Sequence, residues 1–103
     1  MAERFTCAVN EYYRSACKGL DFYGEHEGKR YCVLHFPSEE KREDFEQVKK
    51  SKLAQKDYNF RGAVFPDGTS NFERYEFDAD ADFGQATFVK ADFTRASFYF
   101  VLW

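Results

Sequence analysis

The sequence has little of what a membrane protein or a nucleic-acid-binding protein needs. Among its 103 residues no apolar run is long enough to cross a membrane, and the first residues lack the apolar stretch of a signal peptide. The net charge is only −3, and no basic stripe is available to neutralise a phosphate backbone. We therefore expect a small, soluble, cytoplasmic protein that neither enters a membrane nor binds nucleic acid directly.

Patterns that indicate catalysis are equally scarce. The sequence contains no glycine-rich phosphate loop, no zinc-protease helix motif and no paired carboxylates. No nucleophile stands at a spacing that pairs it with a base. These absences favour a protein that is not an enzyme. The alternative is a Cys/His enzyme in which His35 serves as the base for a cysteine nucleophile.

Phenylalanine, by contrast, is abundant, with 13 copies in a chain that is 20% aromatic. The segment ADFGQATFVKADFTRASFYF, residues 81–100, places Ala and Phe at fixed positions in four consecutive units of five. Neither a helix nor a flat strand has a period of five. The spacing instead predicts units that each form one short extended side and a corner, so that four units close one turn of a square coil.

In such a coil the central Phe of each unit points inward, as does the small residue two positions before it, and the other residues point outward. Successive coils stack about 4.8 Å apart, so we expect Phe60 to lie under Phe83 and Phe65 under Phe88. Trp103 would begin a third coil over Phe83. The alternative is a flat sheet, whose period of two would place successive phenylalanines on opposite faces. The predicted core stack consists of Phe60, Phe65, Phe72, Phe77, Phe83, Phe88, Phe93 and Phe98.

The units ADFGQ, ATFVK, ADFTR and ASFYF resemble the pentapeptide-repeat family, whose unit is roughly Ala, Asp or Asn, Leu or Phe, and two free positions. The resemblance covers residues 81–100 and extends through 58–80, where the turn signal PDGTS at 66–70 lengthens one unit. It implies a right-handed quadrilateral β-helix, here of about two coils. We therefore expect a mainly β chain with one helix, divided into a first part, 1–57, and a coil, 58–103.

Residues 38–57 predict the one helix. Ser38 is a good N-cap, acidic residues follow it, and lysines lie in the second half, as the helix dipole favours. Phe45, Val48 and Leu53 form a sparse apolar stripe. We therefore expect the helix to dock by one face and its charged residues to face water.

The first 37 residues contain all three cysteines and both histidines. Three thiolates and one imidazole make a closed tetrahedral zinc set, and the final C-x2-H has the spacing of a tight metal-binding turn. The alternative is three buried cysteines that act as small apolar residues. Thiols of a cytoplasmic protein are expected to stay reduced. The candidate ligands are Cys7, Cys17, Cys32 and His35, with His26 in reserve.

The stretches YCVLHFP and DYNFRGAVFP resemble the N-terminal module of a subset of bacterial pentapeptide-repeat proteins. That module carries Cys, Cys and a Cys-x2-His pair, followed by Pro, a helix and an F-R-G-x-V-F-P-like start of the coil. The resemblance implies a zinc site that caps the coil. Because four protein ligands leave no open position for water or substrate, the zinc would be structural.

The C-terminal sequence FYFVLW is apolar and would leave the last coil without a polar cap. An exposed apolar end of a repeat structure marks an interface. We expect a second copy, packed end to end about a two-fold axis, or another protein to cover this end. Self-capping by Phe100 and Trp103 is the alternative. The predicted interface residues are Tyr99, Phe100, Leu102 and Trp103.

These features favour a non-enzymatic protein-interaction module that presents a rigid surface. Some pentapeptide-repeat proteins are long acidic rods that imitate nucleic acid and act on topoisomerases. An inhibitor of this kind, directed at a DNA-processing enzyme or, as a phage protein, at a bacterial defence nuclease, is the alternative function. Two coils rise only about 10 Å, however, which is much less than a binding footprint on duplex DNA. The acidic residues that suggest such mimicry are Asp78, Asp80, Asp82 and Asp92.

Overall fold

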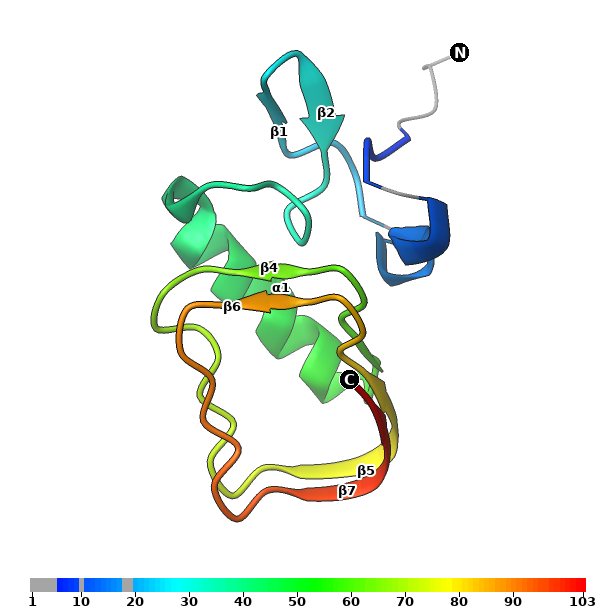
Figure 1. Cartoon of the computed structure of the whole chain (residues 1–103), viewed down its shortest axis with the longest axis vertical. Helices are drawn as coiled ribbons and strands as arrows, with labels where there is room; N and C mark the ends of the chain where they lie inside the picture. Colours follow the sequence, from blue (N-terminus) through cyan, green and yellow to red (C-terminus); the bar gives the residue numbers. More distant parts are fainter. Residues whose placement is uncertain (1–5, 10, 18–19) are drawn as a thin grey trace.

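The computed structural model describes residues 6–9, 11–17 and 20–103, and the other positions all fall in the predicted first part of the chain. It mixes helix with short strands, so the prediction of a mainly β chain with one helix is too simple. The N-terminal part adds 3-10 helices (η), and the corners of the repeat shorten its strands (Figure 1). The elements in chain order are η1 (Glu11–Cys17), β1 (Gly24–His26), β2 (Lys29–Tyr31), η2 (Glu39–Lys41), α1 (Arg42–Ala54), β3 (Tyr58–Asn59), β4 (Val64–Phe65), β5 (Glu76–Asp82), β6 (Thr87–Phe88) and β7 (Ser97–Leu102).

Within the described ranges, no helix combines the length and the apolar character that crossing a membrane requires.

The second half of the chain makes two passes that pair in parallel. We call residues 58–80 the first pass and residues 81–103 the second pass. Strand β5 lies between β3 and β7, and β4 pairs with β6. Figure 1 shows the two passes following each other side by side around a rounded path. The paired positions are Tyr58 with Ala81, Val64 with Thr87, Asn71 with Asp92, Glu76 with Ser97, and Ala81 with Val101.

The phenylalanine rings of the two passes stack on each other in the register that the five-residue spacing predicts. The stacked pairs, with the distances between ring centroids, are Phe60–Phe83 at 5.6 Å, Phe65–Phe88 at 4.7 Å, Phe72–Phe93 at 5.2 Å and Phe77–Phe98 at 4.9 Å. All eight rings belong to one core cluster. The flat-sheet alternative, which would divide them between two faces, is therefore wrong. Ring pairs of this kind add about 0.5–1.5 kcal/mol each to the free energy of burial.

Four corners of the two passes are built in the same way. At each of them the backbone turns two residues after a core Phe, at a residue with positive φ, and the next N–H donates to the carbonyl of that Phe, as in Ala63 to Phe60 at 3.0 Å. This is the pattern of a type II turn, in which the third residue has a positive φ. The residues with positive φ at these corners are Gly62, Arg74, Gln85 and Arg95.

An Asn or Asp stands directly before the Phe at each of these corners. Its side-chain oxygen accepts a hydrogen bond from the N–H of the residue after the Phe, as in Asp82 to Gly84 at 2.8 Å. This local bond favours a turn over continued strand. The four residues are Asn59, Asn71, Asp82 and Asp92.

The predicted helix over 38–57 is shorter and divided in the structure. Ser38 caps η2, where its hydroxyl accepts from the N–H of Glu40 at 3.2 Å. Helix α1 then ends at Ala54, and Lys56 follows with a positive φ of 56°. A residue in this conformation ends a helix.

Helix α1 covers the first pass of rings. Phe45 is buried and meets Phe65 edge-on, with ring centroids 5.0 Å apart. Val48 and Leu53 are only partly buried against the same core. The predicted apolar stripe therefore faces the core but does not fill the contact alone.

Lys49 and Lys52 complete this contact and Lys41 lies over Phe45, contrary to the expectation that the charged residues face water. Lys41, Lys49 and Lys52 are all buried. A long lysine side chain can be buried along its stem while its ammonium stays bonded. Their ammonium nitrogens lie 4.9, 5.3 and 5.2 Å from the ring centroids of Phe45, Phe72 and Phe60, respectively.

Candidate metal centre

A tight turn after β2 supplies two of the four candidate ligands. The carbonyl of Cys32 accepts hydrogen bonds from the N–H groups of His35 at 3.2 Å and of Phe36 at 3.0 Å. This turn brings the side chains of Cys32 and His35 to one side, as a two-residue spacing requires. The sulfur of Cys32 lies 3.2 Å from the Nδ1 atom of His35.

The other two ligands come from the segment that precedes β1. Cys17 is the last residue of η1. Cys7 lies beside β2, because the N–H of Ala8 donates to the carbonyl of Arg30 at 2.8 Å. The N–H of Cys32 in turn points at the sulfur of Cys7 from 3.4 Å.

The structure brings the four predicted ligands together, so this part of the prediction is confirmed. Their ligand atoms all lie within 4.8 Å of one another, and all four residues are buried. The Nδ1 atom of His35 is 3.0 Å from the sulfur of Cys17 and 3.7 Å from that of Cys7. His26 is not part of this group; its ring packs edge-on against Phe36 at 6.1 Å, so the reserve ligand is not needed.

The donor set fits a single small cation. Zinc binds thiolate sulfur at about 2.3 Å and imidazole nitrogen at about 2.0 Å, which places tetrahedral donors about 3.5–3.8 Å apart. The distances from the sulfurs to His35 Nδ1, 3.0–3.7 Å, are close to this range. All three cysteines are free thiols in the structure.

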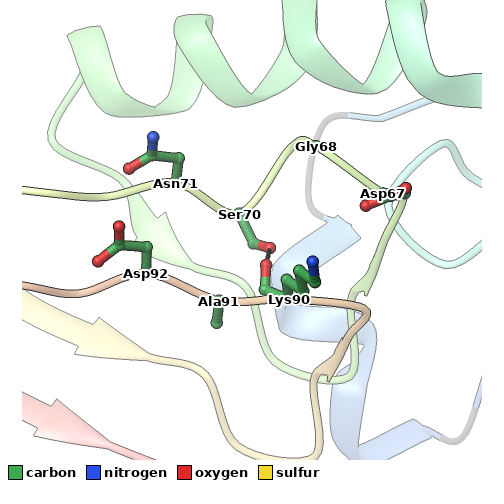
Figure 2. Close-up of a pocket in the computed structure, with 7 residues that line it drawn as sticks. All are labelled: Asp67, Gly68, Ser70, Asn71, Lys90, Ala91 and Asp92. Atoms are coloured by element: carbon green, nitrogen blue, oxygen red, sulfur yellow. Dashed lines mark hydrogen bonds between the residues drawn. The ribbon is translucent and has the colours of Figure 1, made fainter.

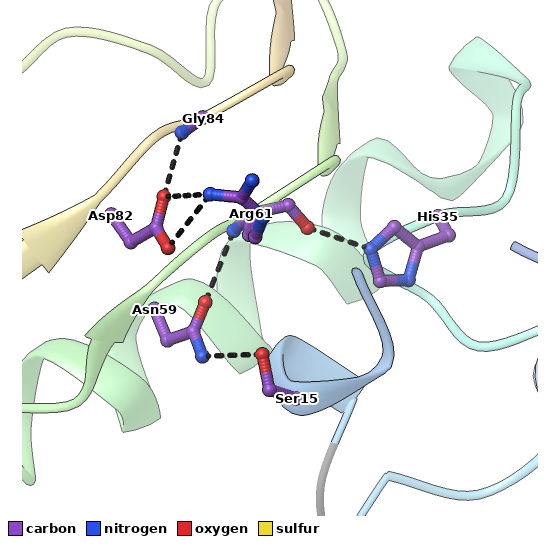
Figure 3. A network of polar contacts seen from close by, with 6 residues as sticks. All are labelled: Ser15, His35, Asn59, Arg61, Asp82 and Gly84. Atoms are coloured by element: carbon purple, nitrogen blue, oxygen red, sulfur yellow. Dashed lines mark hydrogen bonds and ion pairs between the residues drawn. The ribbon is translucent and has the colours of Figure 1, made fainter. Parts of the chain in front are cut away.

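The second ring nitrogen of His35 is held by the first pass of the coil. Its Nε2–H donates to the carbonyl of Arg61 at 3.0 Å (Figure 3). This bond assigns the proton to Nε2, and it leaves the lone pair of Nδ1 directed at the three sulfurs. A histidine that binds a metal usually has its other nitrogen fixed in this way.

The crowding of the cluster shifts the pKa values of Cys7, Cys17 and His35. Hydrogen bonds with Cys32 and Cys7, together with burial, raise the pKa of Cys17, and hydrogen bonds from Cys17 and Cys32 lower the pKa of Cys7. Burial opposes the charged form of His35, but its bonds to Cys32, Cys7 and Arg61 outweigh burial and raise its pKa to about 9. Without a cation the thiols must therefore share protons, which a bound cation would replace.

A polar network joins this cluster to both passes of the coil (Figure 3). The guanidinium of Arg61 lies 3.3 Å from both carboxylate oxygens of Asp82. The amide of Asn59 donates to the hydroxyl of Ser15, in η1, at 3.1 Å. The N–H of Val64 donates to the carbonyl of Leu34 at 2.8 Å, between the two ligands of the tight turn. The segments that carry the candidate ligands are thus bonded directly to the first pass.

The far end of the coil carries the predicted interface residues. The exposed fractions of Tyr99, Phe100, Leu102 and Trp103 are 77, 52, 46 and 62%. Trp103 stacks on Phe83 with centroids 5.6 Å apart, so this residue does cover part of the end.

The alanines that were predicted to point inward differ in burial. Ala91 is exposed, whereas Ala81 is buried between its paired strands. No described segment lies over the second pass at this position.

An open groove lies along one side of the two passes, between Asp67–Asn71 and Lys90–Asp92 (Figure 2). Its polar groups serve the fold. The hydroxyl of Ser70 donates to the carbonyl of Lys90, and Asp92 accepts from the N–H of Thr94 at 2.9 Å. The groove therefore pairs no nucleophile with a base.

No family model matches this chain, and comparisons with curated proteins and with solved structures also found no match.

Proposed function

We propose that this chain is a non-enzymatic protein-interaction module of the pentapeptide-repeat kind. In this proposal residues 58–103 form about two coils of a right-handed quadrilateral β-helix. Residues 1–57 close its first end around a structural zinc ion. The other end is open and joins a second copy of the chain. The observation that carries the proposal is the contrast between the two ends: α1, with its buried Lys49 and Lys52, covers the first pass, whereas the second pass ends in exposed apolar side chains.

The parallel pairing supports the β-helix. Four successive sides of the first pass pair with the second, at residues 58, 64, 71 and 76, and the rings between them stack. The repeated corner, with a side-chain bond before it and a left-handed residue after it, gives a physical reason for a turn at these positions. In this proposal the eight stacked phenylalanines form the core of the β-helix.

The donor set supports zinc in a structural role. Three sulfurs and one imidazole nitrogen prefer a borderline-soft ion, and a closed tetrahedral set of this type is typical of structural zinc. When bound, the ion supplies cross-links between η1, the tight turn after β2 and, through His35, the first corner of the coil. The Cys/His enzyme is disfavoured, because all three thiols and His35 are buried and crowd together in one cluster.

The contacts of the acidic residues weaken the nucleic-acid-mimic alternative. Asp78 is paired with the ammonium of Lys56 at 2.8 Å and accepts from the hydroxyl of Tyr58 at 2.8 Å. Asp82 is paired with Arg61, and Asp92 stabilises a corner. Three of the four candidate charges are therefore engaged within the chain, and little of the acidic row is free to imitate a phosphate backbone.

Self-association through β7 is the form of assembly we propose. One edge of β7 pairs with β5, and in the described structure no strand pairs with its other edge. A two-fold axis beside that edge would pair β7 antiparallel with its copy and would bring the exposed Tyr99, Phe100 and Leu102 side chains of both chains together. An unpaired edge strand with apolar side chains favours such a contact over solvent exposure.

Sedimentation equilibrium of Phe100→Asp tests this assembly. We expect a dimer for the native chain and at least about 2 kcal/mol of lost association for the variant, the size of an interface hot spot. Val89→Asp is the matched control, because Val89 is an exposed apolar residue of the second pass beside β6, away from β7. A native chain that stays monomeric, or equal dissociation by both variants, would contradict a contact through β7.

A further inference from the structure

Lys41 is buried next to the candidate metal centre. Its side chain is fully shielded from solvent. Its ammonium donates to the carbonyls of Val33 at 2.7 Å and Leu34 at 2.9 Å. These are the two residues between the ligands Cys32 and His35, so the ammonium lies against the tight turn that carries both.

This ammonium has no carboxylate partner among the described residues, unlike the other two buried lysines. Lys49 has Glu46 at 2.9 Å and Lys52 has Asp57 at 3.0 Å. Glu39 lies two residues before Lys41, but its carboxylate accepts from the N–H of Asp67 at 2.9 Å and lies 3.6 Å from Arg42.

The carbonyls and the ring face of Phe45, 4.9 Å away, offer Lys41 only partial charges. A buried charge without a counter-charge costs several kcal/mol. Burial accordingly lowers the pKa of Lys41 to about 7, and the negative groups that act against this shift are Cys32, Glu39 and Cys7.

With a divalent cation bound, the candidate metal centre would carry one net negative charge. With an ion bound, three thiolates would carry three negative charges, and His35 would be neutral because Nδ1 would hold the ion while Nε2–H donates to Arg61. A divalent cation then leaves the centre with a net charge of minus one. One buried ammonium balances that charge.

We infer that Lys41 is the counter-charge of the centre formed by Cys7, Cys17, Cys32 and His35, and that the centre therefore takes a divalent cation with all three thiols ionised. This inference rests on the proposed metal site. It makes Lys41 a positioning and charge-balancing residue, which touches no metal itself.

A double-mutant cycle separates this role from a purely structural one. Lys41→Met keeps the length of the side chain but removes its charge, and Cys17→His makes the centre neutral with a divalent ion. We expect Lys41→Met to weaken Co²⁺ binding to the full chain by about 10- to 100-fold in the native background, as outer residues of metal sites do. In the Cys17→His background the loss should fall to within about twofold. Co²⁺ absorbance with a competing chelator measures both.

Lys52→Met is the control, because Lys52 is a buried lysine with its own carboxylate; Co²⁺ affinity should be unchanged. An equal loss from Lys41→Met in both backgrounds would mean that Lys41 only caps the two carbonyls, and would overturn the inference. If Cys17→His gives no tetrahedral Co²⁺ spectrum, the ¹⁵N NMR shift of Lys41 Nζ in the zinc-loaded chain decides. An ammonium supports the inference and a neutral amine overturns it. Failure of the native chain to bind one ion per chain would instead overturn the proposed metal site.

Discussion

Gly62 lies where η1, which ends at the candidate ligand Cys17, packs against the first pass. It has a φ of +68° at the first corner, directly after Arg61, whose carbonyl holds His35. A Cβ atom placed on Gly62 would lie 2.6 Å from the ring of Tyr13, in η1. Any side chain at this position would therefore strain the backbone and also separate η1 from the coil.

We predict that Gly62→Ala lowers the free energy of unfolding by about 2–4 kcal/mol, because it adds a clash to the cost of a left-handed alanine. Gly68→Ala is the matched control. Gly68 also has a positive φ, of +82°, but a Cβ there meets nothing within 4 Å. Its substitution should cost only about 1 kcal/mol. Urea unfolding of both variants measures the difference, and equal losses would show that the contact with Tyr13 does not matter.

At the scale of single residues, the sequence predicted which four side chains lie together, but it did not predict which groups surround them. Cys7, Cys17, Cys32 and His35 could be predicted because few residue types bind metal. The Arg61 carbonyl could not, because every residue has a carbonyl and only the fold decides which one faces His35. Lys41 was also missed, since a lysine in a charged helical segment is normally solvated.

Helix α1 shows how an element can cover a core with few apolar residues. Its predicted stripe packs as expected, but Lys49 and Lys52 complete the contact with their stems. A pattern that counts lysine as polar cannot detect this arrangement, because the stem and the ammonium of one side chain lie in different surroundings. Because lysine was counted as polar, the charged residues of 38–57 were expected to face water.

Lys52 offers a direct test of the stem. We predict that Lys52→Ala lowers the free energy of unfolding by about 2 kcal/mol, because it removes the methylene groups that cover Phe60. Lys52→Met keeps an apolar side chain of similar length and loses the ion pair with the half-exposed Asp57 and the ammonium contact with Phe60, so its cost should be smaller, about 1 kcal/mol. Thermal or urea unfolding distinguishes the two. An equally large loss for both variants would assign the stability to the charge.

The repeated corners were partly visible in the sequence. The spacing of the phenylalanines correctly predicted which rings become neighbours, because four units close one turn even where the turn at 66–70 lengthens one of them. The Asn or Asp before four of the core phenylalanines was noticed only as an outward polar residue. It marks the corners with a left-handed residue, whereas the core phenylalanines that follow Val64, Glu76, Thr87 and Ser97 have no residue with positive φ two positions later. The Asn or Asp before these phenylalanines is therefore a turn signal that the prediction from sequence did not use.

At the scale of the whole molecule, the two ends of the coil differ in how they are finished. The first pass is covered by α1 and tied to the candidate metal centre through His35. The second pass ends in Trp103, which meets Phe83, Phe93 and Phe98 but stays 62% exposed. Partial capping by one ring leaves β7 and its apolar side chains accessible. This asymmetry is the physical reason for proposing an assembly that buries one end and leaves the other unchanged.

Native mass spectrometry of the purified full chain, at micromolar concentration and without added chelator, tests this account most directly. The mass of the folded species reports the number of chains and the number of bound ions together. The account predicts two chains with two zinc ions. A folded single chain, or a folded chain that carries no metal, would contradict it.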